Sequence, residues 1–305
     1  MLTNRPYLPE GMNLTYQRNA LHLLSAGDLK KYASESIPLE CMIDRCDSDH
    51  NLHGRINGLP AVIARSEAIC PGVSGSEKEI AVLSLVGKSV CCELLDAVSG
   101  PDGITLYLTR RRLQEKALAY LEENLCEGDV IPAVITSMSP IGVFADIGCG
   151  IIALLPIRQI SVSRIEHPKE RFSPHQRIWA VVQKIDAAQH RFFLSHKELL
   201  GTWAENAARF QEGETVTGIV RGLKSYGVFV ELAPNLTGLA EADETMQVGQ
   251  RVSVLIKAIL PEKEKVKLHI VGKLPPAERL RPLEYFIHSS NLSQWSYRSE
   301  ITSRL

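Results

Sequence analysis

The sequence predicts a mainly β protein of tandem five-stranded OB-fold barrels that are joined by short α-helices. The 305-residue chain contains a unit of roughly 70 residues twice, and each copy has short β-rich runs separated by glycine-containing turns. A helical stretch precedes each copy, because apolar residues recur there at the spacing of one helix face. A repeated unit of this size indicates separate barrels in a row rather than one shared core.

The two clear copies follow the same order of signals. The first begins at Glu127-Gly128-Asp129 and the second at Glu212-Gly213-Glu214. Their strand-like runs include VIPAVITSMS and PIGVFADIG in the first copy, and TVTGIVRGLK and SYGVFVELA in the second. Apolar residues recur at helical spacing before each copy. They are Leu113, Ala117, Leu121 and Leu125 before the first copy, and Leu199, Trp203, Ala207 and Phe210 before the second. We therefore expect packed connecting helices.

The N-terminal part has a weaker copy of the same strand order, and a short tail follows the last copy. Tyr285, Phe286, Trp295 and Tyr297 in this tail are expected to dock it on a neighbouring barrel. The predicted division is a helical segment 1–36, a degenerate OB-like barrel 37–109, a linker helix 110–126, an OB domain 127–197, a linker helix 198–211, an OB domain 212–271 and a docked tail 272–305.

Composition excludes several classes of protein. The formal net charge of −1 argues against indiscriminate binding to nucleic acids or to anionic membranes. The start of the chain lacks the pattern of a signal peptide, and no apolar run reaches the ~18 residues of a membrane helix. Seven cysteines without a CxxC pair fit a reducing cytoplasm. No catalytic constellation stands out, so we expect a non-enzymatic cytoplasmic protein with no catalytic residues, metal or cofactor.

Charge is unevenly distributed along the chain. Residues 127–197 contain eight Lys and Arg against six Asp and Glu, whereas residues 212–271 contain seven against eight. A basic segment, residues 163–177, includes Arg164, Lys169, Arg171 and Phe172. This segment either guides a phosphate backbone or is a solvated loop. The run Arg110-Arg111-Arg112 fits a solvated helix face.

The ordered motifs of both copies resemble the S-one domain, the OB-type RNA-binding module of ribosomal small-subunit protein one. The second copy supplies Tyr226-Gly227-Val228-Phe229-Val230, Gly238-Leu239, Val248-Gly249-Gln250-Arg251-Val252 and Lys265-Val266-Lys267-Leu268. The first supplies Gly142-Val143-Phe144-Ala145-Asp146, Asp186 and Arg191-Phe192-Phe193-Leu194-Ser195. The N-terminal copy lacks the Gly-x-Phe core.

The resemblance implies binding of single-stranded RNA on one face of each barrel, without catalysis. OB barrels stack bases on exposed aromatic rings and hold phosphates with basic side chains. We expect Tyr226, Phe229 and Phe144 to stack bases, and Arg191, Lys224, Lys265 and Lys267 to contact phosphates. The expected partners are single-stranded RNA, with messenger RNA as a candidate, and the small ribosomal subunit as a second candidate.

The stretch KSYGVFVEL raises a question of geometry. Val228, Val230 and Leu232 alternate as inward residues of a barrel, so Phe229 and Glu231 point outward. Tyr226 joins Phe229 on the outer face only if the strand is bulged or sharply coiled at Gly227. The alternative is a Tyr226 that is half-buried at the end of the barrel.

Several positions depart from the family pattern. Glu241 replaces the family histidine and would repel phosphate, and Lys265 replaces an arginine. In the first copy, Ile141 and Pro156 stand at the positions of the first aromatic residue and the histidine. Each copy is therefore expected to bind weakly and to gain affinity through linkage. A protein–protein scaffold whose barrels have lost RNA affinity is the alternative function.

Overall fold

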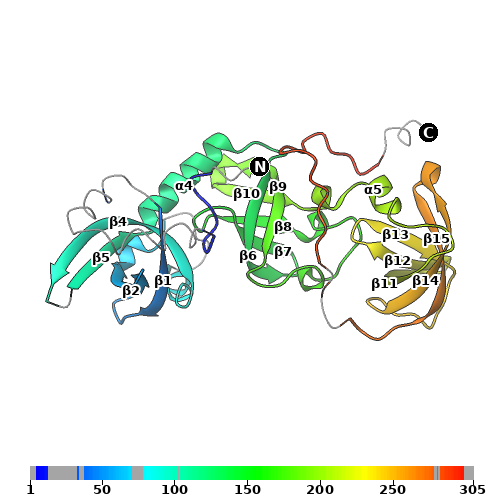
Figure 1. Ribbon diagram of the computed structural model, residues 1–305, viewed down its shortest axis with the longest axis horizontal. Helices are drawn as coiled ribbons and strands as arrows, with labels where there is room; N and C mark the ends of the chain where they lie inside the picture. Colours follow the sequence, from blue (N-terminus) through cyan, green and yellow to red (C-terminus); the bar gives the residue numbers. More distant parts are fainter. Residues whose placement is uncertain are drawn as a thin grey trace.

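The computed structural model describes residues 5–12, 33, 38–70, 78–101, 103–277, 280 and 282–298. Its fifteen strands form three closed five-stranded barrels that lie in a row (Figure 1). The prediction of tandem five-stranded barrels is therefore confirmed. Most of the expected N-terminal helical segment 1–36 lies outside the described residues.

The strands of each barrel are consecutive in the chain. The first barrel contains β1 (Leu39–Cys46), β2 (Leu52–Ile56), β3 (Leu59–Ile63), β4 (Ser89–Gly100) and β5 (Gly103–Thr109). The second contains β6 (Val130–Ser139), β7 (Gly142–Asp146), β8 (Ile152–Pro156), β9 (Arg177–Asp186) and β10 (Arg191–Ser195). The third contains β11 (Thr215–Lys224), β12 (Gly227–Ala233), β13 (Leu236–Ala240), β14 (Arg251–Leu260) and β15 (Lys265–Lys273).

All three barrels share one topology. The third and fifth strands of each barrel pair in parallel and close the barrel, whereas the other neighbours are antiparallel. Each first strand carries a one-residue bulge, at Asp44, Thr136 and Arg221 respectively. A bulge bends and twists the strand, which a small barrel needs in order to close. The N-terminal copy is thus a barrel of the same construction.

The described helices are short. The α-helices are α3 (Lys78–Leu83), α4 (Arg111–Asn124) and α5 (Trp203–Ala207). The 3₁₀ helices are η2 (Arg65–Glu67), η3 (Ile157–Gln159), η4 (Pro168–Glu170), η5 (Ala187–Gln189), η6 (Lys197–Leu200) and η7 (Pro261–Lys263). The helix α4 buries Leu113, Ala117 and Leu121 in the core that it shares with the second barrel.

The helical linker expected over 198–211 is wrong in its length. The chain forms η6, breaks at Gly201 with φ +81°, and restarts as α5. Thr202 and Glu205 form a capping box that starts α5. A Cβ at Gly201 would lie 2.8 Å from the ring of Phe286, so the tail packs where the linker turns.

The C-terminal tail lies along the second and third barrels. Its backbone bonds to the second barrel where Val130 N donates to Ser290 O at 2.9 Å. It reaches the third barrel where the Tyr297 hydroxyl donates to Asn235 O at 2.7 Å. The tail therefore contacts both barrels and the linker between them.

Candidate nucleic-acid interface

Tyr226 lies at the tip of the β11–β12 hairpin. Lys224 pairs with Gly227, so Ser225 and Tyr226 form a two-residue turn. Tyr226 is 66% exposed, and its ring centroid is 6.2 Å from that of Phe229 in an edge-on arrangement. The two rings thus lie side by side, which excludes the half-buried alternative.

The strand is not bulged at Gly227, because the register there is unbroken and the irregularity lies across the hairpin at Arg221. The turn, rather than a bulge, brings Tyr226 beside Phe229. Gly227 is required for a different reason. A Cβ at this position would lie 2.4 Å from the carbonyl oxygen of Ala240 on β13.

A row of side chains crosses the outer face of the third barrel. Phe229 pairs with Leu239 on β13, which in turn pairs with Lys267 on β15. Phe229 is half-buried, whereas Leu239 and Lys267 are exposed. Lys265 lies two residues before Lys267 on the same side of β15, and Lys224 ends β11 beside the hairpin turn. We call this face of β12, β13 and β15 the third-barrel face.

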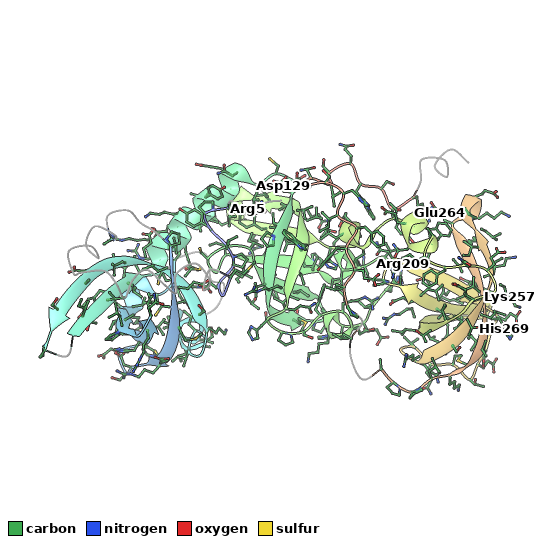
Figure 2. All side chains as sticks on the ribbon, viewed as in Figure 1. Arg5, Asp129, Arg209, Lys257, Glu264 and His269 are labelled. Atoms are coloured by element: carbon green, nitrogen blue, oxygen red, sulfur yellow. The ribbon has the colours of Figure 1, made fainter. Side chains whose placement is uncertain are left out.

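Glu241 does not stand alone on this face. Its carboxylate accepts a hydrogen bond from Lys257 Nζ at 2.8 Å, and His269 Nδ1 lies 3.8 Å from it. Figure 2 shows Lys257 and His269 on the same side of the third barrel. The hydrogen bond from the Lys257 ammonium group lowers the pKa of Glu241, so this carboxylate has a cationic partner beside the face. His269 was not predicted from the sequence, although the alternation of Lys265, Lys267 and His269 along β15 could have revealed it.

The second barrel has the equivalent row. Phe144 on β7 pairs with Leu154 on β8, which pairs with Phe193 on β10. Arg191 is exposed two residues before Phe193 on the same side of β10. Ile141, 61% exposed, occupies the hairpin turn where the third barrel has Tyr226. Phe193 belongs to a sequence motif but was not predicted to stack a base. Its outward position places a second aromatic ring in this row.

The first barrel repeats the pattern with different side chains. His53 on β2 pairs with Val62 on β3, which pairs with Tyr107 on β5. Tyr107 is 44% exposed. His53 Nε2 lies 2.7 Å from an oxygen of Asp47, and this hydrogen bond lowers the pKa of Asp47 to about 2. The row of this barrel therefore has one exposed aromatic ring.

The seven residues predicted from the sequence fall into two groups. Phe144 and Arg191 lie on the second barrel. The other five lie on the third barrel: Tyr226, Phe229, Lys224, Lys265 and Lys267. Two separate faces, one for each barrel, are thus available to a ligand.

Glu231 points out of the third barrel as expected, but it is buried rather than solvated. It is 2% exposed and accepts hydrogen bonds from Arg171 at 2.5 Å and from Arg221 at 2.7 Å. Arg221 also pairs with Glu170. Burial lowers the pKa of Arg171, while the Glu231 carboxylate opposes this shift. This four-residue cluster joins the second barrel to the third.

The basic segment is therefore only partly a solvated loop. Arg171 is held in the inter-barrel cluster, and Phe172 is 1% exposed in the core of the second barrel. Arg164 and Lys169 remain exposed. Arg110, expected on a solvated helix face, is buried and donates to Glu10 at 2.9 Å.

The described part of the chain contains neither a candidate membrane-spanning helix nor a candidate metal cluster. None of its helices is both long and apolar enough to cross a membrane. Within the same residues, His, Cys, Asp and Glu side chains form no group of three or more that could hold a metal ion.

Comparison with known proteins adds two curated relatives. Small ribosomal subunit protein bS1 of Staphylococcus aureus (strain COL) is 31% identical over 191 residues, which are 57% of this chain and 49% of the relative. The bS1 protein of Rhizobium meliloti (strain 1021) is 27% identical over 201 residues, which are 60% and 34% of the two chains. The chain therefore spans about half, or less, of the length of these relatives.

A solved structure covers more of the chain at lower similarity. It is a multidomain protein with nucleic acid binding domains from Streptococcus pneumoniae TIGR4. This protein is 14% identical, with a TM-score of 0.25, over 83% of this chain and 75% of its own.

The family model described as "S1 RNA binding domain" matches residues 125–197. This range contains the whole second barrel, from β6 to β10. The third barrel repeats its topology and its outer row, and the bS1 relatives extend the similarity beyond one domain. The resemblance drawn from the motifs is thus confirmed, because residues 125–197, which contain the second barrel, match the S1 (S-one) RNA binding domain.

Proposed function

We propose that this protein binds single-stranded RNA through its tandem barrels, in translation or RNA metabolism. The observation that supports the proposal is the repeated row of outward side chains at the same pairing positions. The row is Phe144, Leu154 and Phe193 in the second barrel, and Phe229, Leu239 and Lys267 in the third. Aromatic rings on an OB barrel stack bases, and the neighbouring cations hold phosphates.

Each barrel alone offers a modest site. A stacked base contributes ~1–3 kcal/mol, so two aromatic rings per barrel give a weak complex. Two such faces on one chain raise the affinity for an RNA that reaches both of them. We propose messenger RNA as the ligand. We also propose the small ribosomal subunit as a partner, and this second proposal is in keeping with the printed names of the relatives.

Fluorescence anisotropy with labelled single-stranded RNA, at several salt concentrations, tests the proposal. We expect salt-sensitive binding by the wild type. Tyr226→Ala/Phe229→Ala and Phe144→Ala/Phe193→Ala should each weaken binding by ~1–3 kcal/mol per stacked base lost. Ile80→Ala is the control, since Ile80 is an exposed apolar residue of α3 outside both rows.

The result also decides between the two candidate functions. Binding that disappears with the aromatic rings supports an RNA-binding protein. A wild-type chain that binds no oligomer at low salt would contradict the proposal and favour the scaffold alternative.

A further inference from the structure

The second and third barrels meet through hydrogen bonds as well as through the ion cluster. Ser163 Oγ lies 2.8 Å from Thr237 Oγ1, and Ser163 N donates to Pro234 O at 3.0 Å. Val162 N donates to Asn235 Oδ1 at 3.0 Å. Asn235 is fully buried, and its amide nitrogen also donates to two carbonyl oxygens of the preceding linker. These contacts hold residues 162–163 of the second barrel against the third.

This joint borders the third-barrel face. Thr237 and Leu239 lie two residues apart on β13, and Phe229 and Glu231 lie two residues apart on β12. The two side chains of each pair therefore point to the same side of the sheet, and their positions along the strand are about 7 Å apart. Thr237 is in contact with Ser163, and Glu231 is ion-paired with an arginine of the second barrel. The second barrel therefore stands at the edge of the surface that exposes Leu239.

Two exposed cations of the second barrel lie at this edge. Arg164 directly follows Ser163, and Lys169 lies in η4, next to Glu170 of the ion cluster. Among the described residues, no ion pair involves either side chain. A groove lies beside Arg164, lined by Arg164, Ile165, Glu166 and Glu170 of the second barrel and by Arg221, Val248 and Gly249 of the third.

The charge balance of the third barrel indicates why an RNA bound there would need these two cations. Residues 212–271 contain seven basic and eight acidic side chains, so the third barrel alone presents no excess of positive charge. Its Lys257 is paired with Glu241. A phosphate backbone that leaves the third-barrel face toward the second barrel reaches Arg164 and Lys169. The same segment contains two acidic residues, Glu166 and Glu170. Glu170 is paired with Arg221, so the two cations exceed the one remaining negative charge of Glu166.

We infer that the third barrel's RNA site is a composite site, completed by Arg164 and Lys169 of the second barrel. The inference rests on the proposed function and goes beyond it, because it assigns to the third barrel two phosphate contacts that belong to its neighbour. The inter-barrel ion cluster then has a positioning role, since it fixes the distance between these cations and Phe229. The ligand is a single strand that crosses the joint between the barrels.

The test uses the full chain and a labelled single-stranded RNA of about 12 nucleotides, within the range of site sizes of OB folds. Arg164→Gln/Lys169→Gln should weaken binding and reduce the slope of log K against log salt by about 1.4, or ~0.7 per phosphate contact. Lys88→Gln/Arg112→Gln, exposed cations of the first barrel and α4, is the matched control and should leave the slope unchanged. Equal melting temperatures verify folding.

A double-mutant cycle identifies the barrel that these cations serve. Their substitution should have little effect once Tyr226→Ala/Phe229→Ala has removed the third-barrel rings. Arg164→Gln/Lys169→Gln should keep its full effect on RNA binding in the Phe144→Ala/Phe193→Ala background. An unchanged slope, or equal effects in both backgrounds, overturns the composite site while RNA binding itself stands. Absence of RNA binding by the wild type overturns both proposals.

Discussion

Glu231 is the buried charge on which the joint between the second and third barrels depends. Its side chain is 2% exposed, and those of its partners Arg171 and Arg221 are each 6% exposed. Glu231→Gln removes the negative charge and leaves two buried guanidinium groups with Glu170 as the remaining carboxylate of the cluster. Loss of one member of a buried ion pair costs about 3–5 kcal/mol. We expect the free energy of unfolding to decrease by about this amount.

Urea denaturation followed by tryptophan fluorescence measures the loss, because Trp203 lies in the core of the third barrel. Amide hydrogen exchange in β12 locates it. Glu241→Gln is the control, since its partner Lys257 is exposed and such surface pairs contribute little to stability. If Glu231→Gln is as stable as this control, the reasoning about the buried cluster is refuted.

Three further outcomes follow from the structure. Burial raises the pKa of Asp146 from 3.8 to about 7, so the folded chain holds a proton there that the unfolded chain releases. The free energy of unfolding should therefore fall as pH rises from about 4 to 7. Asp146→Asn should abolish this pH dependence in urea titrations. Gly227→Ala should cost more than about 1 kcal/mol in thermal unfolding, because its Cβ would strike β13, whereas Gly272→Ala meets no atom within 4 Å and serves as the control. Glu241→Gln should release Lys257 for phosphate and so strengthen RNA binding and steepen its salt dependence; an unchanged slope would contradict this role.

Sequence patterns predicted the parts of the fold that are set by local periodicity. The alternation of Val228, Val230 and Leu232 identified core positions, and all three are buried. The repeat of glycine and apolar runs predicted barrels because a strand pattern of period two is independent of distant contacts. The same pattern could not reveal that Ser225-Tyr226 forms the hairpin turn, because this pair lacks the Gly, Asn or Asp typical of such turns.

The burial of outward residues could not be predicted in this way. Alternation places Glu231 outside its barrel, and only the docking of the second barrel decides that it is buried. The basic segment shows the same limit, because Arg171 and Arg164 are both arginines of one loop, yet one is paired and buried and the other exposed. Long-range contacts decide which of the two arginines is buried, and a single sequence does not reveal those contacts.

The two acidic residues that follow the face aromatics reveal how the barrels are joined. Asp146 lies two residues after Phe144, as Glu231 lies two residues after Phe229, and both acids are 2% exposed. Glu231 is covered by the second barrel, and Asp146 Oδ2 accepts a hydrogen bond from the backbone of Glu10 near the start of the chain.

Earlier parts of the chain thus cover one end of the face in each of these barrels, while its hairpin end stays open. A strand that runs along the face from the open end toward the joint therefore meets the covering segment. In the third barrel that segment includes Arg164, and Lys169 of η4. The packing that buries Glu231 is for this reason the same packing that holds the segment with Arg164 and Lys169 against the next barrel.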